Sequence, residues 1–166
     1  AVWFVYGCYM RIIELSRIKI SAIDFIKGTI KIDETVCMKS EGREVPLPLE
    51  LIKLLKENRY DLSNEDNYIF SPTGNPGQER ISYHYLRNKW KKFAAKYNIP
   101  VKYKLYGLKH TGNTKMINTG INARVLQKLN GHSNLEYIQK NYTNELSVED
   151  IMWVRQHQPK LGETVK

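Results

Sequence analysis

The sequence lacks several features that mark whole classes of protein. Its 166 residues include two cysteines, Cys8 and Cys37, whose neighbours show no spacing typical of a metal site or a disulfide framework. We expect both to be reduced core residues of a cytoplasmic protein. No apolar run approaches the roughly 20 residues that cross a bilayer, which argues against a membrane protein. The sequence also shows no internal repeat and no low-complexity segment.

The start of the chain is apolar and is not typical of a signal peptide. No basic region precedes residues 1–5 and no cleavage-site pattern follows them. We interpret this start as a helix entered part-way, and the chain as a fragment of a longer protein.

Positive charge is present in excess. The chain has 26 Lys and Arg residues against 17 Asp and Glu residues, a formal net charge of +9. In a soluble domain, nucleic acid is the commonest reason for such an excess, because lysine and arginine neutralise phosphates. A generally basic protein is the alternative. A hydrophobic content of 42% fits one globular domain with a sizeable core.

The apolar periodicity predicts a mostly helical α+β fold. A three- to four-residue repeat indicates a first helix over residues 1–16. Two β-branched runs at 23–26 and 29–32, separated by a Lys-Gly turn, indicate a hairpin, and 43–47 indicates a third strand. Together these runs predict a small three-stranded antiparallel sheet.

The rest of the chain reads as helices joined by loops. A helix is expected from Pro48 to about residue 58, followed by a long loop at 59–81 with an apolar anchor at 68–70. Further helices are expected at 83–97 after a Ser82 cap, at 108–118, and at 123–129 between Asn122 and Gly131. A short helix from residue 133 towards 142, a last one from 147 and a loose tail from 158 complete the prediction.

Two cations in the first part of the chain are candidates for chemistry, each with an ordinary alternative. Arg11 could grip a phosphate with its guanidinium fork, or it could form a buried ion pair with Glu14. Lys39 at a hairpin tip could be a mobile cation or donate a proton to a leaving oxygen, or it could simply be solvated.

The second half carries three further candidates. Lys109 and His110 begin a helix after a basic, aromatic-interleaved run that includes Tyr106. This run suits a phosphate backbone, or forms a solvated basic face. His132 follows a helix-ending glycine, and Tyr142 comes ten residues later. Separately, these two residues are typical of a capping residue and of packing. Brought together by a short helix, an imidazole and a phenol could break and rejoin a phosphodiester without a metal.

In their order and spacing, these residues resemble the catalytic domain of the tyrosine recombinases, the phage-integrase family. The family's first motif is an arginine in a helix with a glutamate three residues on, as at Arg11 and Glu14. A family lysine precedes a strand reading Val-Pro-Leu, as Lys39 precedes residues 43–48. His-x-x-Arg-His-Thr, Leu-x-Gly-His-Ser and the nucleophilic tyrosine follow in the family. They match residues 106–111, residues 129–133 and Tyr142, and the resemblance covers roughly residues 1–145.

Two positions depart from the family pattern. Tyr106 replaces the histidine of the His-x-x-Arg motif, and Lys109 replaces its arginine. Lysine keeps the positive charge but loses the bidentate fork, and a tyrosine is a poor acid or base near neutral pH. Integrases of some mobile elements carry a similar Tyr-x-x-Lys-His-Thr-Gly run. We favour a divergent active enzyme over an inactive one because the charge is retained.

The resemblance implies a mechanism that needs neither a metal nor another cofactor. Tyr142 would attack a DNA phosphodiester and form a 3′-phosphotyrosine, with Lys39 protonating the leaving 5′ oxygen. Arg11 and Lys109 would neutralise the charge of the transition state. The side chains of His132 and Tyr106 would donate hydrogen bonds to the non-bridging oxygens.

The resemblance also implies partners and boundaries. Double-stranded DNA, a homotetramer on paired DNA sites and accessory DNA-bending proteins are the expected partners. Residues 1–157 would form the catalytic domain and 158–166 a flexible tail, while an N-terminal DNA-binding domain would lie outside this fragment. Two alternatives remain: a decayed integrase that acts only as a DNA-binding module, and a type IB topoisomerase-like enzyme that relaxes supercoiled DNA.

Overall fold

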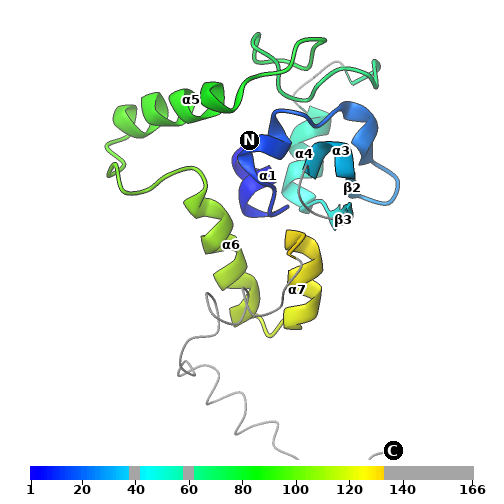
Figure 1. Cartoon of the computed structure of the whole chain (residues 1–166), viewed down its shortest axis with the longest axis vertical. Coiled ribbons are helices and arrows are strands. Elements are labelled where there is room, and N and C mark those ends of the chain that lie inside the picture. Colours follow the sequence, from blue (N-terminus) through cyan, green and yellow to red (C-terminus); the bar gives the residue numbers. More distant parts are fainter. Residues whose placement is uncertain (38–41, 58–61, 133–166) are drawn as a thin grey trace, which may run out of the picture.

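A computed structural model of the chain describes residues 1–37, 42–57 and 62–132 (Figure 1). The predictions for residues 133–166, including the helix towards residue 142 and the tail, lie outside the described residues. Helices and strands follow in the order α1 (Val2–Tyr6), α2 (Ile12–Leu15), the 3-10 helix η1 (Ile20–Ala22), β1 (Ile23–Asp24), β2 (Thr29–Ile32), α3 (Glu34–Cys37), β3 (Arg43–Pro46), α4 (Leu49–Glu57), α5 (Tyr83–Lys96), α6 (Gly107–Asn118) and α7 (Ala123–Asn130).

The predicted three-stranded antiparallel sheet is confirmed. The strands lie in the order β1-β2-β3, with Ile30 opposite Val45 and Ile32 opposite Arg43. Successive side chains point to opposite faces of a strand, so these four residues line the buried face. The first strand is shorter than expected and ends at Asp24. The register matters for function because it turns an arginine, Arg43, towards the core.

The single helix predicted over residues 1–16 is wrong. The chain forms α1 and α2 instead, and between them Tyr9 takes the left-handed conformation with φ 54°. The break lets Tyr9, Met10 and Ile12 all face the interior, where each is at most 5% exposed. Tertiary burial thus outweighs the local helical periodicity. As a result Arg11 lies at the N-terminus of α2 rather than in the middle of a helix.

Two other parts of the first half can be compared with the prediction: one differs from it and one agrees. Helix α3 was not expected, and it follows Asp33, whose carboxylate accepts a hydrogen bond from the Val36 N–H at 3.0 Å. The long loop holds its predicted apolar anchor: Tyr68 forms isolated β-bridges with Lys19 and Gly77, and Ile69 is buried.

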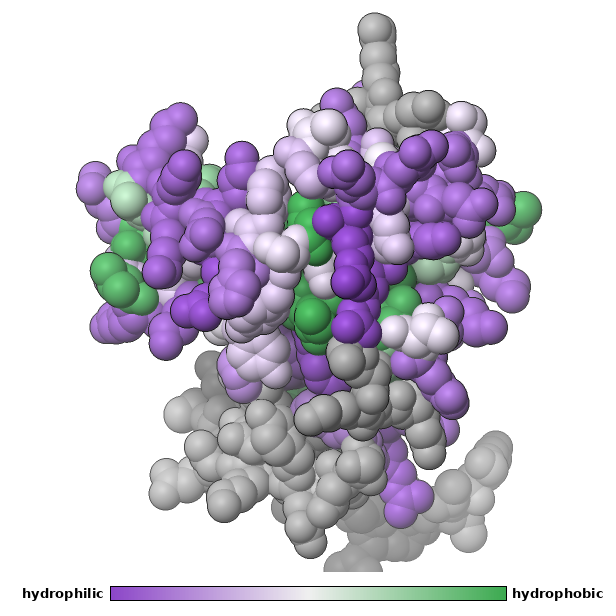
Figure 2. Space-filling view, turned by 45° about the horizontal axis from the view of Figure 1, so that its top comes forward, coloured by the Kyte–Doolittle hydropathy of each residue, from purple (hydrophilic) through white to green (hydrophobic). Residues whose placement is uncertain are grey.

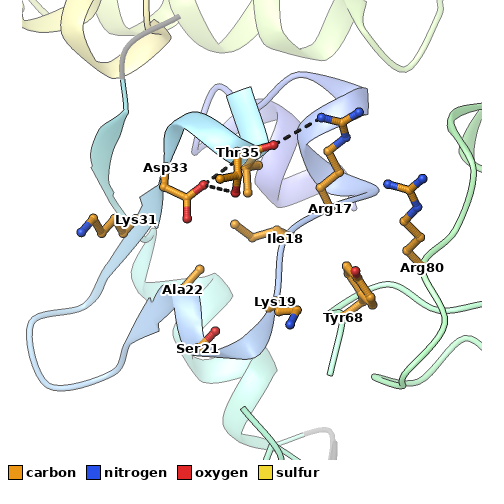
Figure 3. Close-up of a pocket in the computed structure, with 11 residues that line it drawn as sticks. Arg17, Ile18, Lys19, Ser21, Ala22, Lys31, Asp33, Thr35, Tyr68 and Arg80 are labelled. Atoms are coloured by element: carbon orange, nitrogen blue, oxygen red, sulfur yellow. Dashed lines mark hydrogen bonds between the residues drawn. The ribbon is translucent and has the colours of Figure 1, made fainter. Parts of the chain in front are cut away.

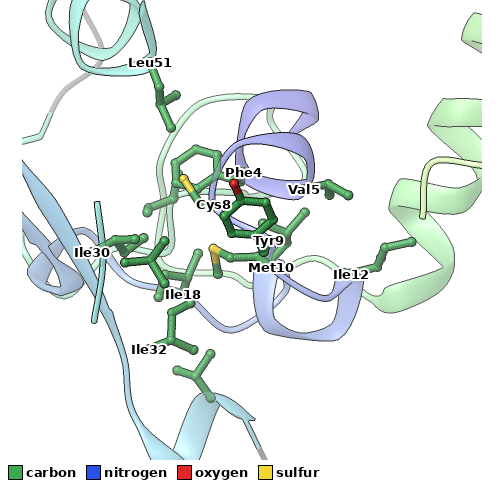
Figure 4. Packing of buried hydrophobic residues seen from close by; sticks show 14 of the residues in the cluster. Phe4, Val5, Cys8, Tyr9, Met10, Ile12, Ile18, Ile30, Ile32 and Leu51 are labelled. Carbon is green, nitrogen blue, oxygen red and sulfur yellow. The ribbon is translucent and has the colours of Figure 1, made fainter. Parts of the chain in front are cut away.

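The core joins α1, α2, β2, β3 and α4. Figure 4 shows Phe4 and Met10 packed with Ile18, Ile30 and Leu51 from segments far apart in the sequence. Both cysteines are buried and free, as expected. In the described part of the chain, no helix has the length and apolar character to cross a membrane.

Helices α6 and α7 are packed onto this core. Helix α6 contacts α1, where Gly112 lies so close to the Tyr6 carbonyl oxygen that a Cβ atom would collide with it. Helix α7 packs on α6 and on β3. The side chains of Asn113 and Asn130, both fully buried, join α6 to α7 through two hydrogen bonds of 3.1 and 2.7 Å. The end of α7 is therefore fixed next to α2 and β3.

Candidate functional site

The site is built around the carboxylate of Glu14, which is fully buried. Arg11 donates to it from its backbone N–H at 2.7 Å and from Nη1 at 2.8 Å. Arg43 donates from Nη1 at 3.0 Å and from Nη2 at 2.7 Å. Burial on its own would raise the pKa of Glu14, but the hydrogen bonds and positive charges of Arg43 and Arg11 hold it below its usual range. Glu14 thus stays ionised between two arginines.

Arg11 joins this carboxylate to the end of α7. Its Nη2 donates to the Gly131 carbonyl oxygen at 3.1 Å. The ion pair predicted between Arg11 and Glu14 is confirmed, yet the Arg11 side chain remains 27% exposed. Pairing with the buried carboxylate therefore orients the Arg11 guanidinium.

Arg43 is a member of the site that the sequence analysis missed. Its side chain is 5% exposed, and its Nε donates to the Leu129 carbonyl oxygen at 2.9 Å. It therefore ties β3 to Glu14 and to the last turn of α7. The available signal was its place in strand alternation, because Arg43 and Val45 share the face that packs inward.

His132 is positioned by the end of α7. Asn122 caps the start of this helix by accepting a hydrogen bond from the Arg124 N–H at 2.8 Å, and Gly131 ends it with a left-handed φ of 61°. Gln127 Nε2 then donates to the His132 carbonyl oxygen at 3.1 Å. Both predicted helix boundaries are confirmed.

The imidazole of His132 lies in a positive environment. Burial, together with the positive charges of Lys109, Arg11 and Arg43, lowers the pKa of His132 to about 4. At neutral pH the ring is therefore uncharged, so it carries one N–H donor.

Lys109 does not lie on a solvated face: it is 1% exposed. Within the residues that the structure describes, its Nζ makes no hydrogen bond. Burial and the charges of Arg11 and Arg43, partly opposed by the charge of Glu14, lower the pKa of Lys109 to about 7. This amine is therefore close to its titration midpoint at neutral pH.

Tyr106 stands where α6 begins and is partly exposed. Its ring meets the His110 ring edge-on at 5.3 Å between centroids. Burial, together with the positive charge of Lys109, lowers the pKa of His110. The structure thus brings Arg11, Lys109 and His132 together, with Tyr106 at the neighbouring end of α6. Lys39 and Tyr142 lie outside the described residues.

Comparison with known proteins identifies the family. The model of the phage integrase family matches residues 1–148. The chain belongs to the phage integrase family.

Relatives within the integrase family are recombinases. The chain is 28% identical over 138 residues to a protein named tyrosine recombinase XerA from Pyrococcus furiosus, covering 83% of this chain and 47% of that protein. It is 29% identical over 135 residues to a tyrosine recombinase from Thermosipho africanus, covering 81% and 45%. The chain therefore spans about half the length of these curated relatives.

Solved structures support the same fold. A crystal structure of XerA recombinase matches with a TM-score of 0.72 and 21% identity, covering 95% of this chain and 57% of that one. The Tn1549 transposon integrase in complex with circular intermediate DNA matches with a TM-score of 0.70 and 18% identity, covering 95% and 58%. The expected α+β recombinase fold is thus confirmed.

A second basic element of this integrase-family chain flanks the site. Residues 83–104, which include α5, contain seven Lys and Arg residues and no Asp or Glu. Figure 2 shows the side of the molecule formed by α5 as mostly hydrophilic, with a few exposed hydrophobic side chains among the polar ones. Within residues 83–104, Phe93 is 47% exposed and Val101 is 92% exposed.

In the described ranges, no cluster of three or more His, Cys, Asp or Glu side chains could hold a metal ion.

Proposed function

We propose that this chain is the catalytic domain of a site-specific DNA recombinase that integrates or excises a mobile element. The observation that carries the proposal is the convergence of Arg11, Lys109 and His132 around a buried, fully hydrogen-bonded carboxylate. Three nitrogen-bearing side chains suit the non-bridging oxygens of a phosphodiester: Arg11 and protonated Lys109 carry positive charge, and neutral His132 carries an N–H donor.

The chemistry proposed for the site is transfer of a DNA strand to Tyr142 and back. The phenol of Tyr142 gives its proton to water as its oxygen attacks the phosphorus, the bond to the 5′ oxygen breaks, and Lys39 gives that oxygen a proton. A 3′-phosphotyrosine results, and attack by the 5′ hydroxyl of a partner strand reverses the step. The partly exposed guanidinium of Arg11 and the N–H of neutral His132 would contact the phosphate oxygens.

Lys109 would take the role of the second family arginine. A phosphate that enters the site supplies the negative charge and the acceptor that the buried amine lacks. A nearby anion favours the protonated form of an amine. DNA binding above pH 7 should therefore be accompanied by proton uptake at Lys109.

A nicked suicide substrate tests the proposal, because it traps the covalent intermediate. The full-length protein should form a protein–DNA adduct, and Tyr142→Phe should abolish it. Tyr97→Phe is the matched control, since Tyr97 is 57% exposed on the α5 side and has no role in the mechanism. An adduct that persists in Tyr142→Phe would contradict the assignment of Tyr142 as the nucleophile.

A non-catalytic DNA-binding module is the second candidate. The departure of Tyr106 and Lys109 from the family motif favours it, because lysine cannot form a bidentate contact. This candidate predicts salt-dependent duplex binding without any adduct from the full-length protein. The same substrate therefore separates the two candidates.

A further inference from the structure

A basic pocket lies away from the site around Glu14. It has a volume of about 590 Å³, and its walls come from the end of α2, η1, β2, α3 and the loop around Tyr68 (Figure 3). Its lining includes four cationic side chains and one carboxylate, Asp33. None of the residues that form the Glu14 site lines it, so its chemistry is independent of the proposed strand cleavage.

Two arginines of this pocket, Arg17 and Arg80, form no ion pair with an acidic residue of the described ranges. Arg17, from the end of α2, donates from Nη1 to the Thr35 carbonyl oxygen at 3.3 Å, but its buried Nε has no hydrogen-bond partner among the described residues. Arg80 comes from the loop before α5 and lies on the same side of the pocket in Figure 3. In the part of the chain that the structure describes, neither guanidinium forms an ion pair. A buried donor without an acceptor costs free energy, which an anion in the pocket would recover.

The single carboxylate of the lining is already engaged. Asp33 accepts hydrogen bonds from the Thr35 hydroxyl at 2.6 Å and from the Val36 N–H at 3.0 Å. The Thr35 hydrogen bond is the main reason that the pKa of Asp33 lies below its usual value. Asp33 thus caps α3, while the guanidinium groups of Arg17 and Arg80 remain available to a ligand.

We propose that this pocket binds a phosphate ester, with its phosphate oxygens held by Arg17 and Arg80. Guanidinium groups match the geometry of phosphate oxygens and form charge-assisted hydrogen bonds with them. The volume exceeds that of one phosphate and falls in the range of small-molecule sites. The Tyr68 ring and the Ala22 side chain offer a surface for the organic part of the ester. The ester is either a free nucleotide-sized molecule or a backbone phosphate of DNA.

Nitrogen-15 NMR of the arginine Nε–Hε groups tests the proposal directly. A mononucleotide titrated into the chain should shift the Arg17 Nε–Hε signal saturably, because its unpaired donor gains an acceptor. Arg80→Gln should weaken the apparent affinity at least about tenfold, the loss expected for a hydrogen bond to a charged group. Arg17→Gln, monitored at Arg80, should do the same. Arg124→Gln is the control, since it removes an exposed charge on α7.

Two parallel titrations identify the source of the phosphate. Saturation by the mononucleotide but not by a short DNA duplex assigns the pocket to a free ester, and saturation by the duplex assigns it to the DNA backbone. Backbone amide spectra of each variant report whether it is folded. Shifts that do not saturate with either ligand, or that are unchanged in a folded Arg80→Gln, would overturn the proposal. Because Tyr142 is not involved, this outcome would leave the adduct experiment unaffected.

Discussion

The two halves of the candidate site differ in how their buried charged groups are paired. On the side of α2 and β3, the Glu14 carboxylate receives four hydrogen bonds from Arg11 and Arg43. On the side of α6, Lys109 is equally buried, but its Nζ has no hydrogen-bond partner among the described residues. Folding thus gives the Glu14 carboxylate its hydrogen bonds, whereas the Lys109 amine gains none within the described residues.

This difference separates positioning from binding. The paired half fixes where the exposed part of Arg11 and the end of α7 lie. Lys109 is held in the same place by packing, and its charged form is costly until an anion arrives. Buried groups left unsatisfied by the fold are frequent at functional sites, where a ligand relieves the cost. Substitutions of Glu14 and of Lys109 test the paired half and the unpaired half separately.

The largest effect is expected from Glu14→Gln. Removing this charge takes the Glu14 counter-charge from the buried guanidinium of Arg43 and from the partly exposed one of Arg11, which should lower the free energy of unfolding by about 3–5 kcal/mol. Glu57→Gln is the control, because Glu57 pairs with Lys53 at 3.8 Å on the exposed face of α4, and such pairs contribute about 0.5 kcal/mol or less. Urea unfolding measures both. A loss in Glu14→Gln as small as that of the control would mean that the paired half does not hold the site together.

A pH-dependent effect is expected from Lys109→Met. The folded pKa of about 7 lies below the ordinary value of 10.5. Between these two pH values, the unfolded chain holds a proton that the folded chain lacks, so stability rises with pH, by up to about 1.4 kcal/mol per pH unit. Below pH 7 both states hold the proton and the penalty is complete. Lys109→Met should remove this rise and be more stable than the parent at pH 7.

Comparing the parent with the variant isolates Lys109 from other groups. Burial raises the pKa of Cys8 to about 12, so this thiol lowers stability only at more alkaline pH. Urea unfolding from pH 7 to 8.5 is therefore the informative window. Parallel stability curves for the two proteins would show that Lys109 is not held with a depressed pKa.

Local rules explain which parts of the fold the sequence could predict. The hairpin at Gly28, the Asn122 cap and the left-handed Gly131 each depend on a few neighbouring residues, and all three are found. The break at Tyr9 depends on what the core requires of residues far away in the chain. Periodicity alone therefore merged α1 and α2 into one helix.

The same distinction holds for the site. The motif spacing predicts Arg11 and His132, because the motif is made of the residues that the chemistry itself requires. The burial of Lys109 and the role of Arg43 depend on how α6, α7 and β3 pack, and no local pattern specifies that. Arg43 also makes contacts 29 and 86 residues away along the chain, which no window of sequence can contain.

The smallest effect should come from Gly131→Ala, and it tests how tightly Arg43 holds the end of α7. Gly131 and Gly120 both adopt left-handed conformations, with φ 61° and 80°, so alanine should cost about 1–2 kcal/mol of backbone strain at either position. A Cβ at Gly120 would meet nothing within 4 Å, whereas one at Gly131 would lie 3.0 Å from Arg43 Nη1. Urea unfolding should therefore show a greater loss for Gly131→Ala than for Gly120→Ala. Equal losses would mean that Arg43 moves aside freely, and a side chain that moves freely cannot fix His132 beside Arg11.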